Sequence, residues 1–159
     1  MESVYIETTV VSYLVSRPSR DVVAAAHQQL TRDWWERRRS QFACFISDVV
    51  LDEARDGDAA QAALRLQALA GFPKLAATPE GERLAGAFLA GVLPPKAAGD
   101  AAHLAIAAVG GVNYLLTWNC AHLANAQLLE RLELIAAGAG HKLPRVCTPE
   151  ELMGLSTYE

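Results

Sequence analysis

The sequence predicts an α/β fold in which a mostly parallel sheet is covered by helices on both faces. Short apolar runs alternate with longer segments in which apolar residues recur every three or four positions. Such alternation is typical of strand–helix–strand units, whose strands lie parallel. Proline and glycine separate these segments one at a time, and no repeat, low-complexity tract or linker occurs. We therefore expect a single domain that spans residues 1–159.

Five short apolar runs are the predicted strands. Each is bounded by polar or turn-forming residues, as expected for strands buried within a sheet. They cover residues 4–6, 42–46, 74–77, 112–117 and 145–147.

The segments between these strands are predicted helices. Ser47 is expected to cap the helix that follows it, and Thr78 with Pro79 is a typical helix start. A capping box at Thr148 and Glu151 predicts a terminal turn. The other predicted helices cover residues 10–15, 20–39, 58–70, 79–90, 100–109 and 123–137.

Composition favours a soluble cytoplasmic protein. Apolar residues make up 52 % of the chain and charged residues 20 %, as in ordinary globular domains. No apolar run approaches the roughly 20 residues of a membrane span, and the acidic start followed by a strand is unlike a signal peptide. Three cysteines, an odd number in apolar or motif sequence, indicate reduced, buried thiols.

The charge is acidic overall but uneven. A net charge of −4 argues against a protein that binds nucleic acid through general basicity. Residues 17–39, however, hold six arginines and three acids, a local charge of +3. This edge, with Arg37, Arg38 and Arg39, could bind the phosphates of a polyanion. The alternative, a solvated helix face with internal ion pairs, is favoured by residue types alone.

Two polar residues directly follow predicted strands. Glu7 comes after the first strand, and Asn119 comes just after the strand at 112–117. Ligands of parallel sheets bind beyond the carboxyl ends of the strands, so both side chains are candidates for a site there. A glutamate that merely begins a helix is the alternative for Glu7.

Two further acids lie on predicted helices. Glu53 shares the helix face of Val49 and Val50, which must pack on the sheet. It could instead belong to an ordinary buried ion pair. Asp100 begins an alanine-rich helix, and a role as the helix N-cap would also explain it.

Together these residues predict a divalent-metal site. Carboxylates against apolar faces are costly unless they share a cation or take part in catalysis. Three carboxylates and the Asn119 amide form an oxygen shell that suits Mg²⁺ or Mn²⁺. Zinc is not expected, because Cys120 and His122 lack a second ligand pair at the usual spacing. His103 is expected to be a packed or hydrogen-bonded helix histidine.

Other common chemistries lack support in the sequence. There is no glycine-rich dinucleotide fingerprint after the first strand, no phosphate-binding loop and no serine nucleophile elbow. Nucleotide-dependent oxidoreductases, NTPases and serine hydrolases are therefore not expected.

Several segments of the chain resemble the PIN-domain family, with the closest likeness to the VapC-type ribonuclease toxins of bacterial toxin–antitoxin modules. The order of the acids along the chain is the specific part of this resemblance, which covers essentially the whole sequence. The matching segments are residues 4–10, 47–53, 100–107, 115–126 and 147–152.

The resemblance implies a three-layer α/β/α fold with a parallel sheet in the order 3-2-1-4-5. It also implies that Glu7, Glu53 and Asp100 are catalytic acids that bind Mg²⁺ or Mn²⁺, with Asn119 at the fourth site. Thr117 would be the hydroxyl residue that often precedes that site by two positions, and Thr8 would support the turn after Glu7. Two departures from the family are Glu7 and Asn119, where aspartate is common.

The resemblance further implies a function and its partners. We expect a metal-dependent endoribonuclease, the toxin of a type II toxin–antitoxin module, with an RNA substrate and a cognate antitoxin protein. A homodimer is also expected, for which Trp34 and Trp35 could supply an interface or, alternatively, simply pack in the core. The rival hypothesis is a non-catalytic PIN domain that binds RNA or a protein, motivated by Asn119 and the acidic net charge. A metal phosphoesterase for a small substrate is a third hypothesis.

Overall fold

The computed structural model describes residues 1–155, so residues 156–159 of the predicted domain lie outside the described part. Residues 1–155 contain seven α-helices, two short 3₁₀ helices and four strands. All strand pairs are parallel, and the strand order is β2-β1-β3-β4. The predicted α/β class with a parallel sheet is thus confirmed.

The elements alternate along the chain much as the sequence predicts. The strands are β1 (Ser3–Ile6), β2 (Ala43–Phe45), β3 (Tyr114–Leu116) and β4 (Arg145–Cys147). The helices are α1 (Thr8–Val15), α2 (Val22–Arg37), η1 (Arg39–Gln41), α3 (Asp48–Ala54), α4 (Ala59–Leu69), α5 (Pro79–Gly91), η2 (Pro95–Ala97), α6 (Ala98–Gly110) and α7 (Ala126–Gly138).

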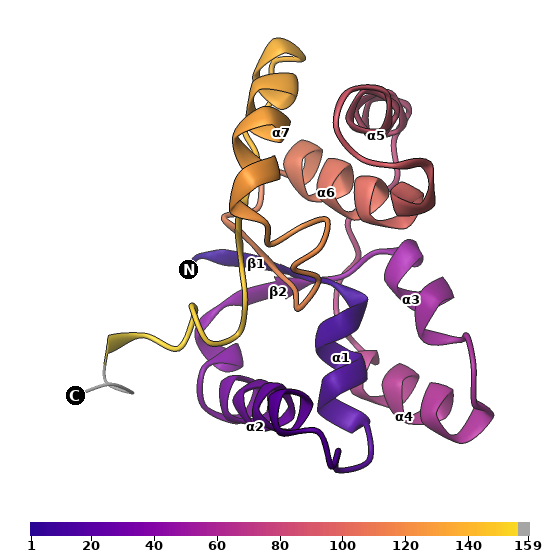
Figure 1. The fold of residues 1–159 in the computed structure, drawn as a ribbon, viewed down its shortest axis with the longest axis vertical. Helices are drawn as coiled ribbons and strands as arrows, with labels where there is room; N and C mark the ends of the chain where they lie inside the picture. The colour runs from indigo at the N-terminus through magenta and orange to yellow at the C-terminus, as the bar shows by residue number, and fades with distance from the viewer. Residues whose placement is uncertain (156–159) are drawn as a thin grey trace.

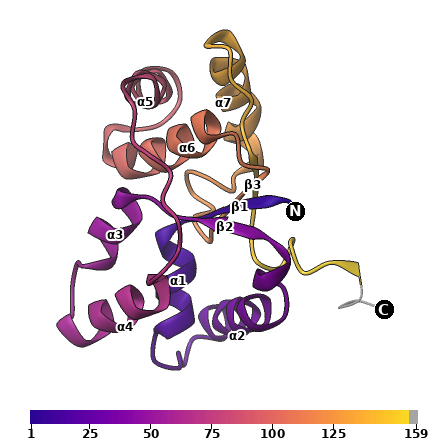
Figure 2. The ribbon, with the colours of Figure 1, turned by 180° about the vertical axis from the view of Figure 1, so that it is seen from behind.

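Helices lie on both sides of the sheet. Figures 1 and 2 show α1, α2, α3 and α4 on one side of the strands and α5, α6 and α7 on the other. Contacts between α1 and α4 and between α5 and α6 join the helices within each group, and α3 also contacts α6. No helix within residues 1–155 has both the length and the apolar character needed to cross a membrane.

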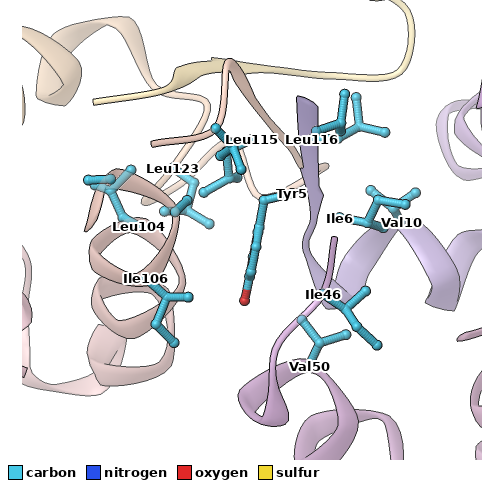
Figure 3. Packing of buried hydrophobic residues seen from close by; sticks show 14 of the residues in the cluster. Tyr5, Ile6, Val10, Ile46, Val50, Leu104, Ile106, Leu115, Leu116 and Leu123 are labelled. Carbon is cyan, nitrogen blue, oxygen red and sulfur yellow. The ribbon is translucent and has the colours of Figure 1, made fainter. Parts of the chain in front are cut away.

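The central strand β1 is buried on both faces. Val4, Tyr5 and Ile6 have no exposed surface, which explains why this strand is a continuous apolar run rather than an alternating one. Figure 3 shows Tyr5 reaching between α6, which contributes Leu104, and the start of α3, which contributes Val50. The apolar ring therefore fills the core while the phenol oxygen is carried toward polar groups.

The third predicted strand, at 74–77, is the main error in the predicted fold. Only one bridge forms there, between Ile46 and Lys74. The Leu75 N–H donates to the Ile46 carbonyl at 2.8 Å, but the chain after Ile46 turns into α3 and offers no further partner. The sheet order is otherwise the expected 3-2-1-4-5 with its third strand missing.

Helix starts differ from the predictions in three places. The helix predicted at 20–39 is two residues shorter at each end. It begins at Val22 because the Asp21 side chain caps it by accepting from the Ala24 N–H. Ser47 occupies the N-cap position of α3, but its hydroxyl makes no cap bond and instead contacts Tyr5. Asp100 lies inside the first turn of α6 rather than at its cap.

The three cysteines are all free, but they differ in exposure. Cys44 and Cys147 are buried, as the sequence predicts, and burial raises the pKa of the Cys44 thiol to about 11. Cys120 is exposed, which contradicts the prediction of three buried thiols. It follows Asn119 in the loop after β3, where the chain leaves the core.

Two glycines at helix ends provide a test of the backbone conformation. Gly111 follows the last residue of α6 and has a φ of +70°, whereas Gly138 is the last residue of α7. At either position an added Cβ would meet no atom within 4 Å. We expect Gly111→Ala to lower the free energy of unfolding by about 1 kcal/mol, because side chains rarely adopt this conformation. Gly138→Ala should raise it by about 0.5 kcal/mol. Urea unfolding measures both, and equal effects would contradict this account.

Candidate metal centre

The candidate site lies at the carboxyl ends of the two central strands. Glu7 directly follows β1, and its N–H donates to the carbonyl of Leu116, the last residue of β3, at 3.0 Å. Thr117 therefore lies beside Glu7, although 110 residues separate them in sequence. The parallel pairing of β1 with β3 thus creates this edge.

Hydrogen bonds fix one oxygen of the Glu7 carboxylate. Oε2 accepts from the Thr9 N–H at 3.1 Å, from the Thr9 hydroxyl and from the Thr117 hydroxyl at 2.8 Å. Because the Thr9 N–H belongs to the first turn of α1, Glu7 is also the N-cap of that helix. Oε1 accepts no hydrogen bond from the residues that the structure describes, and it lies 3.9 Å from Nε2 of His103.

The Glu7 side chain is almost completely buried. The residue is 2 % exposed, and this burial raises the pKa of the carboxyl. His103 and the two threonines act in the opposite direction but do not cancel the effect of burial. The ionised form of Glu7 is therefore held at a cost that an added cation would reduce.

Glu53 reaches the same site from α3. Its Oε1 accepts from the Thr8 hydroxyl at 2.7 Å and is hydrogen-bonded to Nε2 of His103. The side chain is 38 % exposed, so it is open to solvent while Glu7 is not. Partial burial raises the pKa of Glu53, but the contacts with His103 and Thr8 outweigh this and hold it below its usual value.

His103 lies at the centre of the site. It has no exposed surface and comes from α6, one turn after Asp100. Nε2 faces Glu53 and Glu7, while Nδ1 is hydrogen-bonded to the Tyr5 hydroxyl at 2.7 Å. The expected hydrogen-bonded histidine is present, but its position between two acids was missed. Its spacing of three residues from Asp100 on one helix face was the available signal.

Glu7, Glu53 and His103 form one group of possible metal ligands. One ligand atom from each of the three side chains lies within 4.8 Å of the other two. They come from the end of β1, from α3 and from α6, so the fold brings together segments that are far apart in sequence. Two of the three predicted acids are thus neighbours, and a histidine takes the third place.

Asp100 lies beside this group but is paired elsewhere. Its Oδ2 is 3.1 Å from Nδ1 of His122, in the loop after β3. The neighbouring Gly99 lies against Glu53, since a Cβ there would be 3.2 Å from Oε2 of that carboxylate. The first turn of α6 therefore closes one side of the site, and the positive end of the helix faces Glu53.

Asn119 uses its side chain to shape the loop after β3. Its Oδ1 accepts from the His122 N–H at 3.0 Å, and its own N–H donates to the Thr117 hydroxyl at 2.9 Å. Asn119 thereby positions His122 against Asp100. The structure places Asn119 at the predicted edge, with its amide oxygen already engaged within its own turn.

The arginine edge lies away from these acids. Residues 37–39 precede β2, whose first N–H, from Ala43, donates to the carbonyl of Glu2, so they lie at the amino ends of the strands. The guanidinium of Arg39 stacks over Trp35 at 4.9 Å, and that of Arg38 over Phe42 at 5.7 Å. Arg37 is exposed. RNA binding by these three arginines stays a prediction.

The tryptophans near this edge differ in exposure. Trp34 has no exposed surface and stacks against Phe42 at 6.0 Å, so it packs in the core rather than on a surface. Trp35 is half-buried and contacts Phe72 and Arg39. Only Trp35 could contribute to the interface considered from the sequence.

Comparison of the chain with protein-family models, with curated proteins and with solved structures gave no match in any of the three. Function is therefore inferred from the residues and their geometry.

The buried charge of Glu7 predicts a stabilising substitution. We expect metal-free Glu7→Gln to melt higher than the wild type at neutral pH, by roughly 2–4 °C for each kcal/mol gained. The pKa of Glu7 is raised on folding, so wild-type stability falls as pH rises through that folded pKa. The difference between the two proteins should therefore shrink at acidic pH. The pKa of Glu53 is shifted in the opposite direction. Because Glu53 is present in both proteins, its contribution to the pH dependence cancels in the difference between their melting temperatures.

Thermal melts from pH 4 to pH 8 in chelator measure this difference. A Glu7→Gln protein that melts lower at every pH would show that the hydrogen bonds to the carboxylate outweigh its burial.

Proposed function

We propose that this chain is a metal-dependent endoribonuclease of the PIN-domain family, of the VapC toxin type. The observation that carries the proposal is the convergence of Glu7, Glu53 and His103 at the carboxyl edge of a parallel sheet. Glu7 and Glu53 are acids that the resemblance assigns to metal binding. The strand order supports the same family when the bridge at Lys74 is taken as a reduced third strand.

The residues present fit a divalent cation. Two carboxylates offer hard oxygen ligands and two negative charges. Oε1 of Glu7, which accepts no hydrogen bond within residues 1–155, lies 3.9 Å from Nε2 of His103. Glu7 and Glu53 would hold the ion, with Asp100 at the rim. When bound, a Mg²⁺ or Mn²⁺ ion supplies Lewis-acid chemistry, activating water and offsetting the charge that develops on the scissile phosphate.

The side chains around the acids keep them in position. The hydroxyls of Thr9 and Thr117 hold Oε2 of Glu7, so that Oε1 is directed away from them. Thr8 holds Glu53 from the first turn of α1. These hydroxyls fix the orientation of both carboxylates before any ligand arrives, which lowers the cost of assembling the site.

The biological setting belongs to the same proposal. The RNA substrate, the cognate antitoxin protein, the homodimer and the cytoplasmic location all follow from the sequence resemblance. Phosphodiesters suit the site because a cation held by two acids can bind a phosphate oxygen, whereas the metal-free acids would repel it.

A pair of neighbouring acids on α3 tests the proposed function. Glu53 belongs to the site, whereas the side chain of Asp52 is 74 % exposed and pairs with Arg55. We expect Glu53→Gln to reduce cleavage of a labelled RNA in Mn²⁺ by at least about 100-fold, because a ligand and its charge are lost. Asp52→Asn should cleave like the wild type.

The outcome of this assay also separates the rival hypothesis. Wild-type protein that binds the labelled RNA but leaves it intact in Mn²⁺ and in Mg²⁺ would contradict the nuclease and favour a binding module. Equal losses in Glu53→Gln and Asp52→Asn would contradict the assignment of the site.

Asp100 provides a second test. We expect Asp100→Asn to abolish RNA cleavage and weaken Mn²⁺ binding while changing the melting temperature little, because an amide oxygen can still meet His122. Cleavage assays and thermal melts of the same preparation measure both effects. A large fall in the melting temperature of the metal-free variant would instead make Asp100 a structural residue that holds the loop after β3.

A further inference from the structure

We propose that His103 is itself a metal ligand, so that Glu7, Glu53 and His103 form a site that binds Mn²⁺ in preference to Mg²⁺. This inference rests on the proposed function only in placing a divalent cation at this edge of the sheet. It replaces the all-oxygen shell expected from the sequence with two carboxylates and one imidazole.

The first argument is the convergence of the ligand atoms. Nε2 of His103 is in direct contact with Oε1 of Glu53 and lies 3.9 Å from Oε1 of Glu7. Neighbouring ligands of an octahedral ion with bonds of about 2.1 Å lie about 3 Å apart. The contact of Nε2 with Glu53 is shorter than this value and its distance to Glu7 is longer. The Glu53 side chain is partly exposed and can move to the distance that an ion requires. An ion bound to Nε2 would take the place of the hydrogen that His103 and Glu53 now share, and the neutral imidazole would carry its one hydrogen on Nδ1.

The second argument is the unpartnered oxygen of Glu7. The Glu7 side chain is 3 % exposed, and its Oε1 accepts no hydrogen bond within residues 1–155. A carboxylate oxygen that accepts no protein hydrogen bond remains free to bind a cation. The nearest candidate partner is Nε2 of His103, so an ion bound there would satisfy both atoms.

The third argument is the support behind the imidazole ring. A histidine that binds metal through Nε2 carries its hydrogen on Nδ1 and donates it to an acceptor that fixes the ring. Here the Tyr5 oxygen lies 2.7 Å from Nδ1, and the same hydroxyl lies 2.6 Å from the Ser47 hydroxyl. The Tyr5 hydroxyl can accept the Nδ1 hydrogen and donate its own hydrogen to Ser47. All the donors and acceptors in this arrangement are matched.

The ligand types determine the preferred ion. Mg²⁺ favours oxygen ligands and usually keeps several of its water ligands. First-row transition ions bind imidazole nitrogen more readily. Two carboxylates and a neutral imidazole also balance the charge of one dication. The site should therefore prefer Mn²⁺, and a second cation would find little remaining negative charge.

Pulsed electron paramagnetic resonance of Mn²⁺ bound to the wild type tests the proposal directly. We expect modulation from a directly bound imidazole nitrogen, and we expect it to persist in His141→Gln and His122→Gln. His141 is a matched control, since its Nε2 also pairs with a glutamate, Glu80, at 2.6 Å. Absence of the nitrogen signal in the wild type, or its loss in His122→Gln, would overturn the proposal.

Calorimetric titration with Mn²⁺ and with Mg²⁺ gives the energetic test. His103→Gln should lower the Mn²⁺ affinity by at least about 10-fold with a smaller effect on Mg²⁺, whereas His141→Gln should change neither. Tyr5→Phe removes only the hydroxyl that orients the ring and should cost about 10-fold for Mn²⁺. Unchanged Mn²⁺ affinity in both His103→Gln and Tyr5→Phe would overturn the proposal. The Tyr5→Phe and wild-type measurements still decide the matter if His103→Gln does not fold.

These measurements separate the metal site from the nuclease, because none uses RNA. Nitrogen-bound Mn²⁺ in a protein that cleaves no RNA would contradict the proposed function and leave the His103 site standing. RNA cleavage by a protein whose bound Mn²⁺ shows no nitrogen ligand would support the proposed function and contradict the His103 site.

Discussion

The buried carboxylate of Glu7 is the constraint on which the site depends. An ionised carboxylate is costly to bury unless hydrogen bonds and a cation compensate, and hydrogen bonds to charged groups contribute about 1.5–3 kcal/mol each. Thr9 and Thr117 supply the hydrogen bonds to Oε2. These donors belong to α1 and to the residue after β3, so the hydrogen bonds to this one carboxylate fix the positions of both segments. Burial still raises the pKa of Glu7, which leaves the cost only partly offset.

A second hydrogen-bond network connects α3 and α6 to the central strand beside this site. Tyr5 packs its ring in the core, and its hydroxyl is hydrogen-bonded to Ser47 at the start of α3 and to His103 on α6. The ring is anchored by apolar contacts, so the hydroxyl has little freedom to move. The helices that carry Glu53 and His103 are therefore positioned by a residue of the central strand, and the site inherits the rigidity of the core.

The sequence predicts the elements of this fold better than it predicts the contacts between them. Apolar runs and capping residues indicate β1, α5 and the parallel sheet, because these signals are local. The strand expected at 74–77 fails because its partner ends at Ile46, which only the tertiary structure determines. Ser47 stands where a cap is expected, but a buried phenol competes for its hydroxyl.

The same distinction holds within the site. Glu7 and Glu53 could be predicted because each follows from its place on one strand or helix. The pairing of Asp100 with His122 joins positions 22 residues apart, and the contact of His103 with Glu53 joins positions 50 apart. No spacing rule connects such positions. Arg39 was a candidate for RNA because of its charge, whereas its stacking on Trp35 depends on how α2 packs.

The placement of charge suggests how such a site would select its ligand. Without a cation, Glu7 and Glu53 present negative charge at the carboxyl edge of the sheet, while the arginines lie at the amino edge. A phosphodiester would then be repelled from the acids. A bound dication reverses this, because it balances both carboxylates and leaves coordination positions for phosphate oxygen. Affinity for a polyanion at this edge would thus depend on the bound metal. If His103 is a ligand as proposed, its imidazole would add a bond to the ion without adding negative charge.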